Sequence, residues 1–60
     1  MNFAAYFFAF FLSGQPFADG ALFATLAECQ ATVAKAAVNV AEFNAKGENV
    51  DKIISYAAGC

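Results

Sequence analysis

The sequence contains no histidine, no tryptophan and no arginine, and it has a single proline among its 60 residues. Charged residues make up only 13% of the chain and leave a net charge of −2. Without a basic patch, the chain has no means of neutralising phosphates, so nucleic acid is not an expected partner. Without histidine, and with its two cysteines far apart in sequence, it also lacks the ligand pattern of a zinc site. No cofactor is expected.

Hydrophobic residues make up 62% of the chain, including eight phenylalanines and two tyrosines. A chain of this length buries only roughly 60% of the surface that its unfolded form exposes. Small scaffolds of this kind need a disulfide, a metal or an oligomer to become stable. Since the sequence does not favour a metal, we expect a disulfide, association between chains, or both.

The longest apolar run covers residues 3–12 (FAAYFFAFFL). Aromatic residues favour strands, and short uninterrupted apolar runs fit strands that are covered on both faces, so we predict a strand over 3–12. The main alternative is a signal peptide of residues 1 to about 20, although no lysine or arginine precedes the run. The run is too short to cross a membrane, which needs about 20 residues, but it is suited to lying on a membrane surface.

Turn-forming residues dominate positions 13–20 (SGQPFADG), which contain two glycines and the proline. Such a cluster predicts a turn over 13–20. The next residues, ALFA, are apolar again and predict a second, shorter strand over 21–24. The two strands would form a hairpin with a loop of several residues.

A capping box opens the next element at Thr25. The Thr25 hydroxyl is expected to accept from the backbone N–H of Glu28, while the Glu28 carboxylate reaches back to the N–H of Thr25. The sequence that follows is rich in alanine, and Gly47 provides a C-terminal cap, so we predict one long helix over about 25–46. Its apolar stripe consists of Leu26, Cys29, Val33, Ala36, Val40 and Phe43.

By pattern alone, the tail fits either a strand or a short helix capped by Asn49. A bridge between Cys29 and Cys60 would decide between them, because the tail must then return along about 25 Å of helix. A helical tail covers only about 15 Å, whereas an extended one at ~3.3 Å per residue covers the whole distance. We therefore predict a strand over 50–58 together with a Cys29–Cys60 disulfide.

These elements predict a single small α+β domain with the order ββαβ. A right-handed crossover through the helix makes the third strand parallel to the second. If the third strand lies beside the first, the sheet has the order 2-1-3, with the most hydrophobic strand in the centre. The long helix then covers one face of the sheet and brings the two cysteines to the same level.

The central strand presents apolar side chains on both faces. One face carries Phe3, Ala5, Phe7, Ala9 and Phe11, and the other carries Ala4, Tyr6, Phe8, Phe10 and Leu12. A single helix covers only one of them, and the sequence leaves open which. The uncovered face would be a patch of several hundred Å², larger than soluble monomers normally expose. The candidate interaction residues are the aromatic ones: Phe3, Tyr6, Phe7, Phe8, Phe10 and Phe11.

The sequence offers no catalytic constellation. A reactive cysteine would need a histidine, a second cysteine at CxxC spacing or a basic neighbour, so a structural bridge is the favoured interpretation. Glu48 and Asp51 lie beside a glycine turn with lysines nearby, and we interpret them as parts of a solvated loop. No enzymatic activity is expected. A stable bridge implies an oxidising compartment or an extracellular particle.

An aromatic strand, a glycine turn and a short strand precede the motif Phe-x-Thr-x-x-x-Cys, which opens an alanine-rich helix and is followed by a late cysteine. The residues that carry this layout are Phe23, Thr25, Cys29 and Cys60. The layout resembles small phage-encoded, disulfide-bearing proteins of unassigned role. This resemblance implies a virion accessory role, such as decoration, cement or minor structural protein. The chain departs from exported relatives by lacking a cationic start, which places secretion in doubt.

The sequence thus predicts a non-enzymatic structural or interaction protein that assembles with itself or within a larger protein assembly. Its expected location is a virion, another extracellular particle or an exported compartment. One alternative is an exported peptide released by cleavage near residue 20. The other is a small protein held on a membrane surface by its phenylalanine run.

Overall fold

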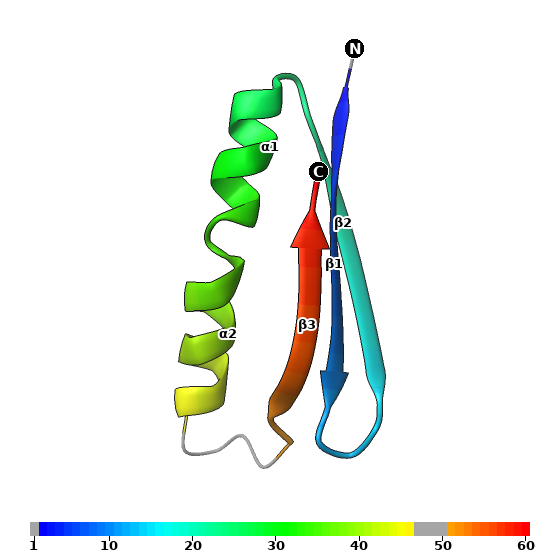
Figure 1. Ribbon diagram of the computed structural model, residues 1–60, viewed down its shortest axis with the longest axis vertical. Helices are drawn as coiled ribbons and strands as arrows, with labels where there is room; N and C mark the ends of the chain where they lie inside the picture. The colour runs from blue at the N-terminus through cyan, green and yellow to red at the C-terminus, as the bar shows by residue number, and fades with distance from the viewer. Residues whose placement is uncertain (1, 47–50) are drawn as a thin grey trace.

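The computed structural model describes residues 2–46 and 51–60, and it has the predicted ββαβ architecture (Figure 1). Along the chain its elements are β1 (Phe3–Phe11), β2 (Pro16–Phe23), α1 (Leu26–Val33), α2 (Ala36–Ala45) and β3 (Ile53–Gly59). The sheet has the order β2-β1-β3, and β1 is antiparallel to both neighbours. β3 is therefore parallel to β2, and the predicted order 2-1-3 is confirmed.

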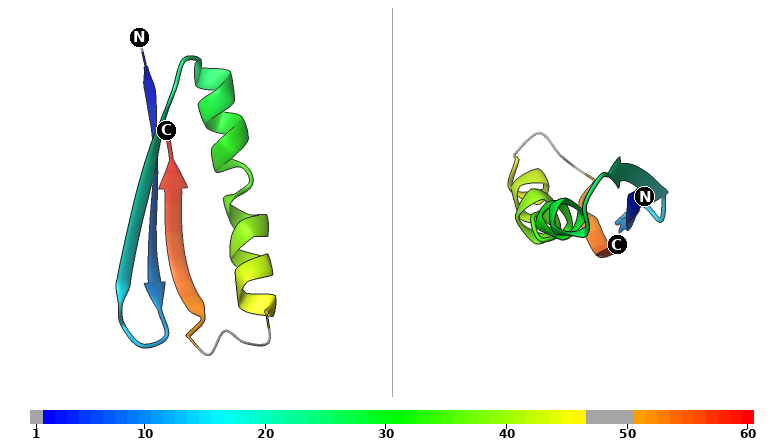
Figure 2. Two further views of the ribbon diagram at one scale, coloured as in Figure 1. Left: turned by 180° about the vertical axis from the view of Figure 1, so that it is seen from behind. Right: turned by 90° about the horizontal axis from the view of Figure 1, so that it is seen from above.

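The molecule has two layers, because both helices lie on one face of the sheet (Figure 2). α1 makes its main contacts with all three strands, whereas those of α2 are with β3. Among the residues that the structure describes, only Ala9 and Cys29 are fully buried, with 1% and 0% of their surface exposed. A core this small matches the expectation that a 60-residue chain needs a covalent bridge or a partner.

β2 begins earlier than predicted, and the turn at 13–20 is correspondingly shorter. Pro16 is the first residue of the strand, and the turn that precedes it includes Gly14, whose φ is 91°. The prediction treated the proline and the Asp-Gly pair as turn chemistry. β2 is an edge strand, however, and a proline that opens an edge strand removes no hydrogen bond from the ladder. The Asp19 carboxylate meanwhile accepts from the backbone N–H of Gly20 at 2.8 Å.

The helical segment extends over the predicted residues but is divided into α1 and α2 by a turn at Ala34 and Lys35. The Thr32 hydroxyl donates to the Glu28 carbonyl, one turn earlier, at 3.0 Å. Threonine bonds of this type bend helices. The Lys35 N–H then bonds to the Thr32 carbonyl, three residues back rather than four. These local bonds explain why an alanine-rich segment is not one straight helix.

The N-terminal cap forms, but with one bond different from the prediction. The Thr25 hydroxyl oxygen accepts from the Glu28 N–H at 3.1 Å, as expected. The Glu28 carboxylate, however, accepts from the Thr25 hydroxyl, also at 3.1 Å, rather than from the Thr25 N–H. A hydroxyl both donates and accepts, so this one side chain pairs with one free N–H of the first helical turn and holds the carboxylate at the positive end of α1.

The predicted helical stripe faces the sheet except at its first position. Leu26 is exposed, Cys29 is fully buried, and Val33, Ala36, Val40 and Phe43 are half-buried. The rings of Phe43 and Phe11 lie 5.9 Å apart.

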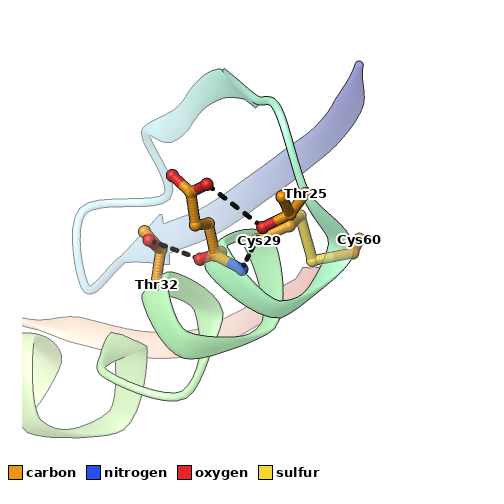
Figure 3. The surroundings of a disulfide bond; sticks show 5 residues. Thr25, Cys29, Thr32 and Cys60 are labelled. Atoms are coloured by element: carbon orange, nitrogen blue, oxygen red, sulfur yellow. Dashed lines mark hydrogen bonds between the residues drawn. A yellow bond between two sulfur atoms is a disulfide. The ribbon is translucent and has the colours of Figure 1, made fainter. Parts of the chain in front are cut away.

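The disulfide between Cys29 and Cys60 is present, with a Cα–Cα distance of 6.2 Å, and it ties α1 to the end of β3 (Figure 3). β3 starts at Ile53 rather than at the predicted residue 50, and position 50 lies outside the described residues. Its extended form carries Cys60 back to the first turns of α1. The predicted combination of a Cys29–Cys60 bridge with an extended tail is therefore confirmed.

We expect the double variant Cys29→Ala/Cys60→Ala to lose roughly 3–4 kcal/mol of unfolding free energy, because the bridge closes a loop across 31 positions. Urea denaturation at fixed protein concentration measures this loss, and wild-type protein in reductant should match the variant. An unchanged midpoint would show that the bridge contributes nothing to stability.

A second link joins the helical layer to the sheet at the opposite end, through Asn44. Its side-chain amide donates to the Ile53 carbonyl at 3.0 Å and accepts from the Ile53 N–H at 2.9 Å. The side chain thus pairs with both backbone groups of Ile53, as a neighbouring strand would. The Lys52 ammonium also donates to the Asn44 carbonyl at the end of α2.

Asp51 ties the start of β3 to the turn between β1 and β2. Its carboxylate accepts from the Ser13 N–H at 2.9 Å and from the Ser13 hydroxyl at 2.6 Å. The Leu12 N–H donates to the Lys52 carbonyl at 2.7 Å. Asp51 thus lies in a loop, as interpreted, but its carboxylate also bridges segments 38 positions apart. Glu48, its predicted companion, lies outside the described residues.

Replacing Asn44 with alanine should cost about 1–3 kcal/mol, because it leaves both backbone groups of Ile53 without their partner. Hydrogen exchange should show the Ile53 amide losing protection, while amides in the middle of β1 keep theirs. Asn39→Ala is the matched control, since Asn39 is an exposed asparagine of the same helix. Equal effects of the two substitutions would contradict this role for Asn44.

Candidate functional site

The sheet face turned away from the helices is the candidate site. Residues of β1 alternate between half-buried or buried positions and exposed ones, which fixes the face that the helices cover. The exposed large side chains on the uncovered face are Tyr6 (46%), Phe8 (52%), Phe10 (51%), Leu12 (66%) and Leu22 (68%). We call this surface the outer face. It resolves the question that the sequence left open.

Three of the six predicted interaction residues belong to the opposite, helix-facing side. Phe3, Phe7 and Phe11 are half-buried there, because alternate residues of a strand point to opposite faces. The ring of Phe7 stacks on Tyr56 at 5.9 Å and meets Phe17 edge-on at 6.2 Å. The predicted interaction set is therefore corrected to Tyr6, Phe8 and Phe10.

Small residues flank this aromatic row on both sides. Residues directly opposite each other in neighbouring strands share a face, so the strand register defines the flanking rows. On β2, the residues opposite Phe10, Phe8 and Tyr6 are Pro16, Ala18 and Gly20. On β3, the residues opposite the same three are Ser55, Ala57 and Gly59. The outer face is therefore one aromatic ridge between two shallow rows.

The two rows differ because Tyr6 leans over one of them. A Cβ atom added to Gly59 would lie 2.8 Å from the Tyr6 hydroxyl oxygen and 2.9 Å from its Cε1 atom. The ring of Tyr6 therefore covers Gly59 and also contacts Phe8, at a centroid distance of 5.8 Å. The β2 row remains open.

The sequence pattern does not predict the β2 row. Pro16, Ala18 and Gly20 fell within the predicted turn, so they had no face assigned. Leu22 lay within the predicted strand, and its alternation with the inward Phe23 was the signal that could have revealed it. Once β2 is extended back to Pro16, alternation alone places all four on the outer face.

The outer face carries no charged side chain among the residues that the structure describes. Its residues on the three strands are aromatic, aliphatic or small, with Ser55 as the one hydroxyl besides that of Tyr6. Asp19 is opposite Phe7 and so belongs to the helix-facing side. Glu28 and Glu42 are on the helices. These three acidic side chains therefore lie away from the outer face.

The helix-facing side has a hollow of its own, a cavity of about 290 Å³ between the helices and β2. Phe7, Phe17 and Val33 supply apolar walls, and Asp19 and Asn39 are among its polar lining residues. A single carboxylate without a neighbouring nucleophile or base does not form a catalytic constellation. Inward-pointing charges on edge strands also discourage edge-to-edge pairing, which is a sufficient role for Asp19.

Within the described ranges, no three histidine, cysteine, aspartate or glutamate side chains lie close enough to hold a metal ion. Both thiols are consumed by the disulfide. None of the helices in the described part of the chain is long and apolar enough to cross a membrane.

Comparison with known proteins identifies no relative: no family model, curated protein or solved structure matches this chain.

Replacing a phenylalanine by alanine should lower the unfolding free energy by different amounts on the two faces of β1. We expect Phe7→Ala to cost about 2–3 kcal/mol, since it removes a half-buried ring from the helix-facing side. Phe8→Ala should cost about 1 kcal/mol or less in the dilute protein, because its ring faces solvent there. Urea denaturation at the lowest workable concentration compares them, and equal losses would mean that the faces are assigned incorrectly.

Proposed function

We propose that this chain is a non-enzymatic structural protein that is built into a protein assembly through its outer face. The observation that carries the proposal is that the central strand is apolar on both sides, while the helices cover only one. No catalytic or metal-binding group of the described residues lies on the other side.

The magnitude of the exposed surface supports this proposal. A half-exposed aromatic ring presents about 100 Å² and a largely exposed leucine a similar area, so the three rings and two leucines together present about 500 Å². At ~25 cal/mol per Å², covering this area would contribute on the order of 10 kcal/mol before the costs of association. That is comparable to the whole stability of a typical small domain. A surface of this kind is expected to be covered when the protein works.

The disulfide indicates an oxidising setting, either extracellular or exported. Within that setting we propose a component of an extracellular particle. The resemblance to small phage-encoded proteins carried by Phe23, Thr25, Cys29 and Cys60 suggests a virion accessory component that decorates, cements or completes a shell. A small domain with a disulfide between its helix and its sheet, and with one apolar outer face, is suited to such an accessory role.

Attachment to a membrane surface is less well supported. Interfacial segments combine an apolar face with lysine or arginine beside it, and they use tryptophan at the boundary. The chain has no arginine or tryptophan. Of its three lysines, Lys35 and Lys46 flank α2, and Lys52 donates to the carbonyl of Asn44 at the end of that helix. Co-sedimentation with anionic vesicles, lost in Phe8→Ser, would favour the membrane alternative instead.

Release of an exported peptide by cleavage near residue 20 would remove all of β1, which pairs with both other strands. The bridge between Cys29 and Cys60 would remain. The intact mass of the protein from its natural source separates the two cases. The structural proposal expects the full-length mass, increasing by about 2 Da on reduction of one bridge.

Hydroxyl-radical footprinting of the chain in its natural source tests the structural proposal directly. Tyr6, Phe8 and Phe10 should be oxidised several-fold more slowly there than in the purified, diluted chain. Val38, which is 56% exposed on α2, is the internal control and should react alike in both samples. Equal reactivity of the outer face in both samples would overturn the proposal.

A further inference from the structure

We infer that the partner covering the outer face is a second copy of this chain, packed sheet against sheet around a two-fold axis. The inference rests on the proposed function and identifies its partner. Each copy would keep its helices on the outside, so the dimer would have the layers helix, sheet, sheet and helix. Aligned sheets of this kind pack about 10 Å apart.

Charge permits this self-contact. A two-fold interface places the same patch on both sides, so a charged residue on it would bring charges of the same sign close together. The described residues of the outer face carry none, although the chain as a whole has a net charge of −2. The acidic side chains Asp19, Glu28 and Glu42 are on the helices or on the helix-facing side.

The shape of the face is complementary to itself. A ridge of Tyr6, Phe8 and Phe10 stands beside the open row of Pro16, Ala18 and Gly20 on β2. Two copies shifted sideways by one strand, ~4.8 Å, would each lay their ridge in the β2 row of the other. The row on β3 is less accessible, because Tyr6 already covers Gly59.

A two-fold axis parallel to the strands produces this shift and keeps residues at the same height. Phe8 is paired with Ala18 across β1 and β2 within one chain. After the shift, Phe8 of one copy therefore faces Ala18 of the second copy, and the reverse contact forms as well. The inferred interface thus contains two identical Phe8–Ala18 contacts.

The area is sufficient for a stable pair. The five large side chains present about 500 Å² per copy, and the flanking small residues add to it. A face-to-face pair would bury roughly 1,200 Å² in total, which is the lower end of specific protein interfaces. The burial would also supply the apolar core that Ala9 and Cys29 alone do not provide.

A size-exchange experiment tests the inferred contact. Phe8→Ala leaves two holes in its own dimer, and Ala18→Phe creates two clashes, so each variant alone should dimerise at least 100-fold more weakly than wild type. In a heterodimer of the two variants, one contact pairs the alanine introduced at position 8 with the phenylalanine introduced at position 18. The other contact is the wild-type Phe8–Ala18 pair. Native mass spectrometry should therefore detect a heterodimer whose affinity is within about tenfold of the wild-type dimer.

Val38→Phe is the matched control, because it enlarges an exposed side chain on α2, away from the sheet. It should dimerise as wild type does. The inference is overturned if the mixture contains no heterodimer, or if either variant alone dimerises as tightly as wild type. Outer-face protection in the natural source together with a monomeric wild-type chain would mean that the face binds a different protein. The proposed function would then survive without this inference.

Discussion

The central strand β1 is apolar on both faces, and the described residues provide one helical layer, which covers one of the two faces. Placing Phe3, Phe7 and Phe11 on the helix-facing side leaves Tyr6, Phe8 and Phe10 on the other side, because side chains of a strand alternate. No rearrangement within a two-layer domain removes this surplus. The links described above hold the helices against the helix-facing side, and the strand residues of the outer face carry no charge.

Two links at opposite ends hold the helical layer in place. The Cys29–Cys60 bridge ties the first turns of α1 to the end of β3, and the Asn44 amide ties the end of α2 to the start of β3. Between these points, the bend near Thr32 divides the helix. The helices are thus held against the helix-facing side of the sheet by a covalent bond and a few directed hydrogen bonds rather than by a large core.

Sequence reasoning recovered the architecture because independent constraints agreed. The aromatic run, the capping box at Thr25 and the spacing of the two cysteines were all consistent with the same ββαβ arrangement. It failed where tertiary context outweighs local chemistry. Pro16 and Gly20 are turn-forming residues locally, but an edge strand tolerates them. The bond from Asp51 to Ser13 joins positions that only the finished fold brings together. The outer face can be assigned only when the side of the sheet covered by the helices is known. Alternation of the side chains alone does not decide that side.

The most direct test of the central claim is the mass of the intact, oxidised protein by sedimentation equilibrium over a wide concentration range without detergent. Covering the outer face with a second copy predicts a reversible increase from 6.3 kDa to twice that value as concentration rises. A chain that remains at 6.3 kDa up to the highest concentration, with its sheet intact, would contradict the inferred pairing of two copies. It would show that the apolar outer face is stable in water without a partner copy.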